Sequence, residues 1–197
     1  MELLDIVDEN GNPTGETVER ETAHRQGIRH RTSHVWIVRK KEGITEESAS
    51  DTESAWQILL QKRSRDKDSH PGCYDISSAG HIPAGSGFLD SAIRELFEEL
   101  GVVAEESELR YCGTRKLCWE ETFYGKLFRD NQVSNVYLLE RDLKEEEFHI
   151  QESEIESVMW MDFEECVRAV REGSIPNCIV MEELEMVRAT LVKRKAS

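Results

Sequence analysis

Three glutamates in the middle of the chain have the residue type and the spacing that bind a divalent cation. Glu95, Glu98 and Glu99 stand at positions i, i+3 and i+4, and a helix would carry all three carboxylates on one face. Like charges at this spacing repel one another and weaken an isolated helix. A cation such as Mg²⁺, which favours carboxylate oxygens, would offset that repulsion. The alternative is a merely solvated acidic face.

The element that must position these glutamates is a predicted helix from Phe88 to Leu100. Gly101 follows it, and glycine is the residue that most often ends a helix in the left-handed conformation. Four apolar residues fall on the side opposite the glutamates, namely Leu89, Ile93, Leu96 and Leu100. We therefore expect one core face and one strongly acidic face.

The same segment resembles the Nudix box, G-x5-E-x7-R-E-U-x-E-E-x-G-U, in which U is an aliphatic residue. Eight of the nine specified positions match: Gly80, Arg94, Glu95, Leu96, Glu98, Glu99, Gly101 and Val102. The preceding Pro71-Gly72-Cys73-Tyr74 is similar to the lead-in of that family. The resemblance covers the chain from Ser33 to about Arg171.

This resemblance implies an α/β fold, the Nudix-type α/β/α sandwich with a mixed sheet. It implies a metal-dependent hydrolase that cleaves a diphosphate linkage in a small metabolite, for example a nucleoside diphosphate derivative. Glu95, Glu98 and Glu99 would bind Mg²⁺ or Mn²⁺, with the carbonyl of Gly80 as a further ligand. The catalytic set would be Glu95, Glu98 and Arg94, whose planar guanidinium would orient a box glutamate.

One position departs from the pattern, because the box glutamate expected six residues after Gly80 is Ser86. In the family this glutamate supports the box. Asp90, four residues before Arg94, is a candidate to replace it as the ionic partner of that arginine. Ser86 is alternatively a helix cap.

The general base of such an enzyme often comes from a loop outside the box. Glu152, Glu154 and Glu156 lie in an acidic stretch before Trp160 and are candidates. Most charges in such a run are only solvated. Four aromatic residues are candidates to stack a base, or else belong to the core: Trp119, Phe123, Tyr124 and Phe128.

A second resemblance is to isopentenyl diphosphate isomerase, a Nudix relative with a catalytic cysteine and glutamate. His24, His30 and His81 would match the metal-binding histidines of that enzyme. However, Ala79 and Gln132 stand where the cysteine and the glutamate are expected. Neither side chain titrates in the useful range, so hydrolysis is the stronger interpretation. A third reading is a non-catalytic Nudix-like binding module, which would have no need for three repelling carboxylates.

The remaining sequence predicts mixed strands and two more helices, which favours an α/β sandwich. We expect strands at 3–8, 33–38, 55–61, 74–79, 109–117, 119–128, 133–139 and 157–161. Asp162 and Glu165 have the spacing of a capping box that opens a helix to Arg171, and a last helix should span 181–192. We divide the chain into an N-terminal extension (1–32) packed on a Nudix domain (33–197). We expect residues 40–54 to form a solvent-exposed excursion in the loop of a β-hairpin.

The composition and net charge limit the kinds of partner that this protein can bind. The chain carries 25 basic and 40 acidic residues, a formal net charge of -15, which argues against binding of a nucleic-acid backbone. No segment is long and apolar enough for a membrane span. Five cysteines without C-x-x-C spacing, and no signal peptide, indicate a cytoplasmic protein with reduced thiols. The expected partner is a small diphosphate substrate, and family habit favours a homodimer.

Overall fold

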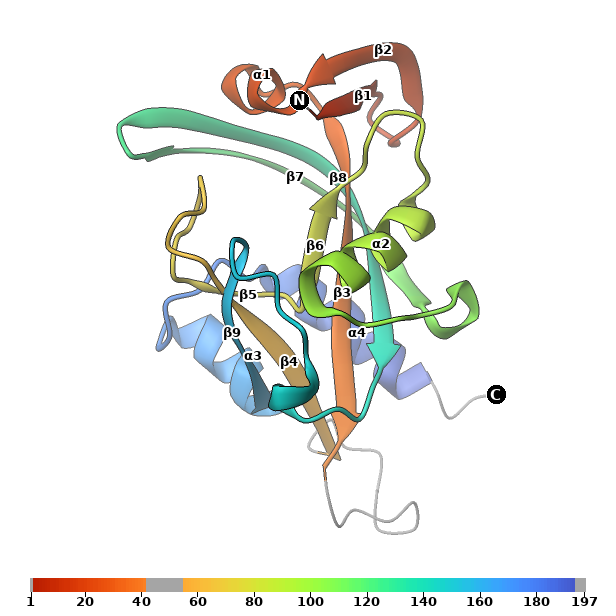
Figure 1. Cartoon of the computed structure of the whole chain (residues 1–197), viewed down its shortest axis with the longest axis vertical. Helices are drawn as coiled ribbons and strands as arrows, with labels where there is room; N and C mark the ends of the chain where they lie inside the picture. Colours follow the sequence, from red (N-terminus) through yellow and green to blue (C-terminus); the bar gives the residue numbers. More distant parts are fainter. Residues whose placement is uncertain (1, 42–54, 194–197) are drawn as a thin grey trace.

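A mixed β-sheet forms the centre of the computed structural model, which describes residues 2–41 and 55–193 (Figure 1). Within that part of the chain the sheet has seven strands, and its main path runs β5-β4-β3-β8-β7. The path consists of β3 (His30–Lys40), β4 (Trp56–Arg63), β5 (Tyr74–Asp75), β7 (Arg110–Phe123) and β8 (Lys126–Glu140). Two more strands complete the sheet, β6 (Ser78–His81) beside β3 and β9 (Ile155–Asp162) beside β4. β3 and β8 are parallel, and the other pairs are antiparallel.

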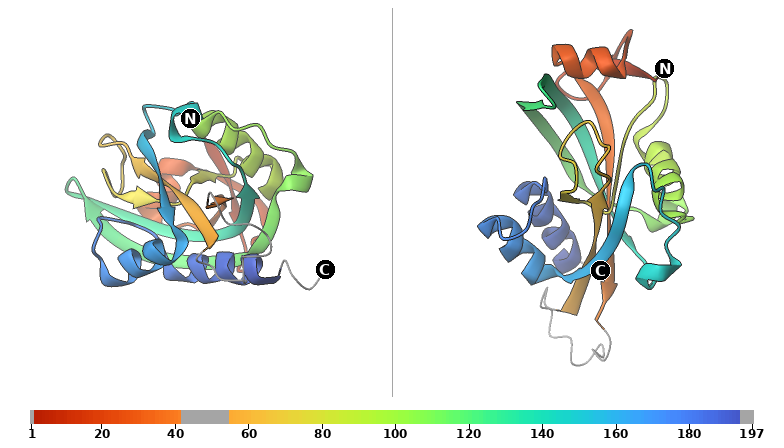
Figure 2. Two further views of the ribbon diagram at one scale, coloured as in Figure 1. Left: turned by 90° about the horizontal axis from the view of Figure 1, so that it is seen from below. Right: turned by 60° about the vertical axis from the view of Figure 1, so that its left-hand side comes forward.

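Both faces of this sheet are covered, because the side chains of β3 alternate between two apolar clusters. Val35 and Ile37 pack with the core residues of α2 (Phe88–Leu100). Trp36 and Val38 pack on the other side with α3 (Phe163–Glu172) and α4 (Met181–Lys193). Figure 2 shows the helices on opposite sides of the sheet. The predicted α/β/α sandwich is therefore confirmed.

The N-terminal segment forms a small unit of its own at one end of the sheet. β1 (Leu3–Val7) and β2 (Pro13–Glu19) make a two-stranded hairpin, and α1 (Arg20–Gln26) leads from it into β3. Leu4 of β1 is fully buried, so the hairpin is packed against the body of the molecule (Figure 1). Two short 3₁₀ helices, Glu106–Glu108 and Glu145–Glu147, lie in connecting segments.

Three details of the predicted elements were wrong. The strand expected at 119–128 is instead the end of one long hairpin, because Tyr124 and Gly125 have positive φ values and turn the chain between β7 and β8. The strand expected at 74–79 is divided into β5 and β6, which pair with different neighbours. Asp162 is the N-cap of α3, but its side chain makes no capping hydrogen bond, so the capping box is absent.

The helix predictions agree closely with the structure. α2 has the predicted bounds, and Gly101 after it adopts the left-handed conformation. Residues 42–54, which include most of the predicted excursion, lie outside the described residues. In the described segments, no helix has the length and apolar composition needed to cross a bilayer.

Candidate active site

The two ends of the box motif are brought together by β6 and α2. Gly80 lies in β6, and a Cβ atom at this position would overlap the carboxyl group of Glu95. Glycine is therefore required here by the close approach of that side chain. Arg94 donates from Nη2 to Oε1 of Glu95 at 2.6 Å, and its Nε lies 3.7 Å from Oε2 of Glu98. Arg94 thus contacts two of the box glutamates, and its role in orienting them for catalysis stays a prediction.

The three box carboxylates differ in their surroundings. Glu99 is only 4% exposed and accepts a hydrogen bond from the backbone N–H of Ala79 at 3.2 Å. Burial raises the pKa of Glu99 to about 8 and also raises the pKa of Glu95. Glu98 is exposed. α2 carries the three carboxylates on consecutive turns as predicted, with Glu95 and Glu99 against β6 and Glu98 exposed. The role of the three as metal ligands stays a prediction.

Both predictions for the missing box glutamate at Ser86 were wrong. The N-cap of α2 is Gly87 and receives no side-chain hydrogen bond, so Ser86 does not cap the helix. Asp90 lies next to Gly87, while Arg94 pairs with Glu95 and Glu98 instead.

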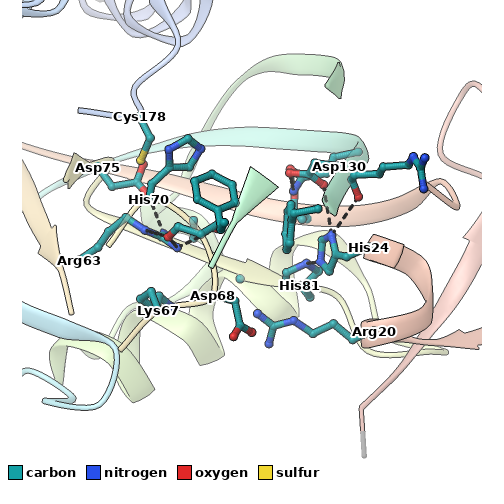
Figure 3. A pocket seen from close by; sticks show the side chains of 18 of the residues that line it. Arg20, His24, Arg63, Lys67, Asp68, His70, Asp75, His81, Asp130 and Cys178 are labelled. Carbon is teal, nitrogen blue, oxygen red and sulfur yellow. Dashed lines mark hydrogen bonds and ion pairs between the residues drawn. The ribbon is translucent and has the colours of Figure 1, made fainter. Parts of the chain in front are cut away.

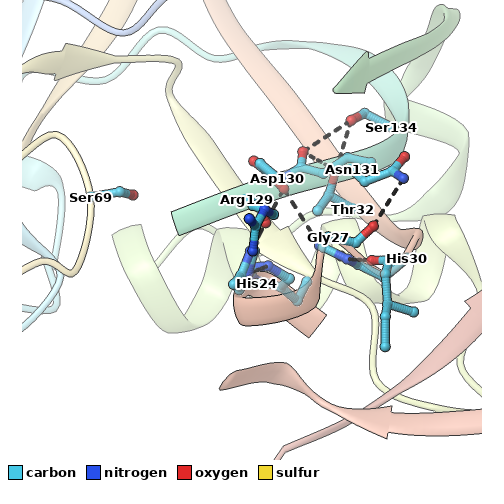
Figure 4. Close-up of polar contacts among 12 residues, drawn as sticks. His24, Gly27, His30, Thr32, Ser69, Arg129, Asp130, Asn131 and Ser134 are labelled. Atoms are coloured by element: carbon cyan, nitrogen blue, oxygen red, sulfur yellow. Dashed lines mark hydrogen bonds and ion pairs between the residues drawn. The ribbon is translucent and has the colours of Figure 1, made fainter. Parts of the chain in front are cut away.

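A cluster of histidines lies beside this loop. In the described part of the chain, His24, His30 and His81 form the one group of three or more His, Cys, Asp or Glu side chains whose candidate ligand atoms all lie within 4.8 Å. Asp130 of β8 adds a carboxylate whose Oδ1 is 3.8 Å from Nδ1 of His24 and 3.7 Å from Nε2 of His30 (Figure 4). We refer to these four residues as the histidine centre.

The tautomers of two of these histidines are fixed by backbone carbonyls. Nδ1 of His30 donates to the carbonyl of Ile28 at 2.9 Å, and Nδ1 of His24 donates to that of Arg129 at 3.4 Å. In each ring the lone pair is therefore on Nε2, which is the arrangement found in metal-binding histidines. Burial lowers the pKa of His24 to about 3 and lowers the pKa of His30 and His81.

Two buried atoms in the histidine centre have no hydrogen-bond partner, Nε2 of His30 and Oδ1 of Asp130. Both are acceptors when His30 is neutral and Asp130 is ionised, so they cannot satisfy each other. Nε2 of His24 and Nε2 of His81 also approach to 2.9 Å. A buried polar group without a partner is costly, and a cation among these atoms would satisfy them. The three histidine nitrogens that lie within 4.8 Å of one another are ligands that Zn²⁺, Mn²⁺ or Fe²⁺ accepts, with Asp130 beside them.

A large cleft is lined by His24, His81 and Asp130 of the histidine centre and reaches the box at Gly80, while the box glutamates are not among its lining residues. Its volume is about 1680 Å³. His81 and Asp130 form part of its lining (Figure 3). Basic side chains of α1, of the end of β4 and of the β4–β5 loop also line it, namely Arg20 and Arg25, Arg63, and Arg65 and Lys67. Several have acidic partners: Arg20 pairs with Glu2, Arg63 with Asp75 and Lys67 with Glu154.

The far wall of the cleft is aromatic. The ends of β7 and β8 project beyond the rest of the sheet above the β4–β5 loop (Figure 1), and the hydroxyl of Tyr124 donates to the carbonyl of Arg65 at 3.2 Å. Phe128 stacks on Trp119 and on His24, with centroids 5.7 and 4.3 Å apart. Trp119, Phe123 and Phe128 thus line the cleft and do not belong to the two core clusters.

Sequence reasoning missed two residues of this site. Asp130 was not recognised as a partner of the histidines, because nothing in its local sequence indicates that β8 runs past α1. Lys67 lies in a polar loop without periodicity. Of the three candidate bases, Glu154 lines the cleft, whereas Glu156 pairs with Lys62 at 2.8 Å.

Comparison with known proteins identifies the family of the chain. The family model described as NUDIX domain matches residues 48–177. The chain belongs to the Nudix family. The curated relative "Nudix hydrolase 3" of Arabidopsis thaliana is 38% identical over 173 residues, which is 83% of this chain and 20% of that protein. This Nudix chain therefore spans one fifth of the Arabidopsis relative. An uncharacterized Nudix hydrolase of Clostridium acetobutylicum is 33% identical over 85% of this chain and 73% of its own length.

The fold of this Nudix protein also matches solved structures. A crystal structure from Deinococcus radiodurans has a TM-score of 0.63 at 20% identity and covers 95% of this chain and 98% of its own. The NUDIX domain of NrtR from Shewanella oneidensis, solved with ADP ribose, has a TM-score of 0.55 at 14% identity and covers 82% of this chain and 87% of its own. An isopentenyl-diphosphate Delta-isomerase of Pectobacterium atrosepticum is 32% identical over 97 residues, 49% of this chain and 46% of its own length.

Proposed function

We propose that this protein is a metal-dependent hydrolase that cleaves a diphosphate linkage in a small metabolite, such as a nucleoside diphosphate derivative. The observation that carries the proposal is the position of the box relative to the cleft. Gly80 forms part of the cleft lining, and the carboxyl group of Glu95 lies directly against it. A phosphate group in the cleft would therefore meet the box at β6.

Glu95, Glu98, Glu99 and the carbonyl of Gly80 would hold Mg²⁺ or Mn²⁺, because all are oxygen donors. Burial raises the pKa of Glu99 to about 8, and a cation bound beside this residue would favour its carboxylate form. When bound, the cation would polarise a phosphoryl oxygen and lower the pKa of an attacking water. Arg94 holds Glu95 in position through its hydrogen bond of 2.6 Å.

The histidine centre adjoins the box, because His81 follows Gly80 directly. We assign it a second divalent cation, for which its unpartnered acceptors and fixed tautomers are the support. The box remains the site of phosphoryl chemistry in this proposal. The second cation would add positive charge to a cleft that a protein of net charge -15 otherwise leaves unfavourable for anions.

The other side chains of the cleft have separate roles. Lys67 and Arg20 carry N–H donors for the phosphate oxygens, and binding would require them to exchange their present partners Glu154 and Glu2. Glu154, once released from Lys67, is the candidate general base of the acidic stretch that precedes Trp160. The aromatic wall offers Trp119 and Phe128 for the non-phosphate part of the substrate.

A substrate screen tests the proposal. Phosphate release should be measured over nucleoside diphosphate derivatives, dinucleoside polyphosphates and prenyl diphosphates, with Mg²⁺, with Mn²⁺ and with chelator. We expect turnover of at least one class that chelator abolishes and added metal restores. Turnover that resists chelator would contradict the metal-dependent mechanism. Binding of a diphosphate without turnover of any class would favour the non-catalytic module.

A further inference from the structure

The loop between the two ends of the box, residues 82–87, is held by the N-terminal hairpin. We call this segment the box loop. Leu4 of β1 forms an isolated bridge with Pro83, and the backbone N–H of Ala84 donates to the carbonyl of Leu3 at 2.8 Å. Leu4 is also fully buried. The box loop therefore packs along β1, a strand that lies far from it in the sequence.

One carboxylate of the hairpin binds the box loop directly. Oδ2 of Asp5 accepts the backbone N–H of Gly85 at 2.9 Å. The same oxygen accepts Nη2 of Arg31 at 2.8 Å, and that nitrogen also donates to the carbonyl of Ser86 at 2.9 Å. Asp5 and Arg31 thus bind the backbone of the box loop at Gly85 and at Ser86, the position where the box glutamate is missing.

This ion pair is well shielded from solvent. The side chains of Asp5 and Arg31 are 12% and 8% exposed, so screening by salt is weak. The guanidinium of Arg31 also lies 5.2 Å from the centroid of the Phe88 ring, at the first residue of α2. The pair therefore contacts β1, β3, the box loop and the start of the metal-binding helix.

We propose that Asp5, held by Arg31, replaces the missing box glutamate as the carboxylate that positions the box loop. The inference rests on the proposed hydrolytic function. Gly80 lies at one end of the loop and Glu95 lies beyond its other end, so the shape of the loop sets the relation between the carbonyl of Gly80 and the carboxylates of α2. With Ser86 in the motif, the required negative charge is supplied from another segment of the chain.

The proposal makes the N-terminal hairpin part of the hydrolytic unit. Asp5 and Arg31 both precede residues 48–177, the segment that the family model matches. They are positioning residues, because neither is assigned a contact with metal or substrate. Loss of Asp5 should therefore raise the metal requirement without a comparable change in substrate binding.

The test uses the full chain and compares Asp5→Ala with Thr14→Val. Thr14 is a matched control, because its hydroxyl donates to the carbonyl of Ile6 within the same hairpin at 3.0 Å and does not reach the box loop. We expect Asp5→Ala to raise the Mg²⁺ concentration for half-maximal rate by about 10-fold or more, as for other groups that orient metal ligands. The KM for substrate should change by less than about 3-fold, and Thr14→Val should stay within about 2-fold of wild type throughout.

Two further measurements keep the test decisive. Adding Ser86→Glu to Asp5→Ala restores the motif and should recover most of the lost metal affinity. Hydrogen exchange at the Gly85 amide, measured without substrate, should be about 10-fold faster in Asp5→Ala than in Thr14→Val. If Asp5→Ala does not fold, Asp5→Asn replaces it.

An unchanged metal requirement in Asp5→Ala, or an equal loss in Thr14→Val, would overturn the inference. If the wild-type protein hydrolyses nothing, the proposed function fails by itself. The exchange experiment then decides the inference, and a Gly85 amide that stays protected in Asp5→Ala would refute it.

Discussion

Glu183 is a buried carboxylate of α4 that joins this helix to the sheet. It accepts hydrogen bonds from Nδ1 of His34 at 2.8 Å, Nε1 of Trp36 at 3.0 Å and Nε of Arg115 at 2.7 Å. Burial alone would raise the pKa of Glu183, but His34 and Arg115 hold it at about 2. Glu183 is therefore ionised in the folded protein, at the wall of the cleft.

We predict that Glu183→Gln lowers the free energy of unfolding at pH 7 by on the order of 3 kcal/mol, because Arg115 loses its buried partner. A carboxylate with a depressed pKa stabilises the fold above its unfolded value of 4.5 and loses this effect as the pH falls towards 2. The difference between wild type and variant should thus be constant from pH 7 to pH 5 and narrow below that. Urea unfolding at several pH values measures it, with the exposed Glu182→Gln as control. A difference that does not depend on pH would contradict the assignment.

A second residue-scale prediction concerns the isomerase resemblance. Gln132 is engaged at both ends of its amide, since Oε1 accepts from Thr32 at 3.1 Å and Nε2 donates to Asp130 at 2.5 Å. Neither Gln132 nor Ala79 can move a proton to or from carbon. We predict no enzymatic deuterium exchange into isopentenyl diphosphate, measured by NMR in D₂O with excess Mg²⁺ and an authentic isomerase as control. Rapid deuterium incorporation, together with formation of the dimethylallyl product, would show that the protein is an isomerase. A trace of deuterium exchange in the double variant Ala79→Cys/Gln132→Glu, and none in the wild type, would indicate common ancestry with the isomerase but a different reaction.

At the scale of elements, α2 and α3 end in the same way but in different surroundings. Gly101 and Gly173 are both left-handed C-caps, with φ values of 69° and 63°. A Cβ at Gly101 would lie 2.7 Å from Cβ of His149, whereas nothing lies within 4 Å of a Cβ at Gly173. The end of α2 is therefore packed, and the end of α3 is open.

This contrast gives a matched pair of substitutions. Gly173→Ala should cost about 1 kcal/mol of folding free energy, the penalty for a left-handed residue with a side chain. Gly101→Ala should cost clearly more, on the order of 2–3 kcal/mol, because His149 must also move. Thermal or urea unfolding of the two variants measures the difference. Equal costs would show that the segment at His149 shifts freely and does not fix the end of α2.

The elements that could be predicted are those whose sequence signals lie within the element itself or directly next to it. Gly101 and the apolar spacing of Leu96 and Leu100 were sufficient for the bounds of α2. The histidine centre was only partly predictable, because Asp130 joins His24 and His30 through the parallel pairing of β3 with β8. That pairing depends on tertiary packing, as does the contact of Asp5 with the box loop. The turn at Tyr124 was missed because tyrosine is an uncommon residue at positive φ.

At the scale of the whole molecule, the ends of β3 and β4 lie side by side. The N–H of Lys41 donates to the carbonyl of Ala55 at 2.9 Å, and Lys40 pairs with Trp56 in the antiparallel ladder. The intervening residues are polar and lack periodicity. We therefore predict that this segment is dispensable for stability and turnover.

Replacement of residues 42–53 by a short Gly-Asn turn tests this prediction. The free energy of unfolding should change by no more than ~1 kcal/mol, because loop closure depends weakly on loop length. Thermal unfolding and substrate turnover of the shortened chain are the measurements. A large fall in the thermal midpoint would show that the segment packs on the body, and lost turnover alone would show that it acts at the site.

The proposed hydrolysis depends on a divalent cation held by the box glutamates. The most direct test is phosphate release by wild type, Glu98→Gln and Glu99→Gln over a series of Mg²⁺ concentrations, with the exposed Glu146→Gln as a charge-matched control. Removal of either box carboxylate should lower the rate at least about 100-fold, on the order of 3 kcal/mol, while the control keeps the wild-type rate. Wild-type rates in both box variants at every Mg²⁺ concentration would contradict the central claim.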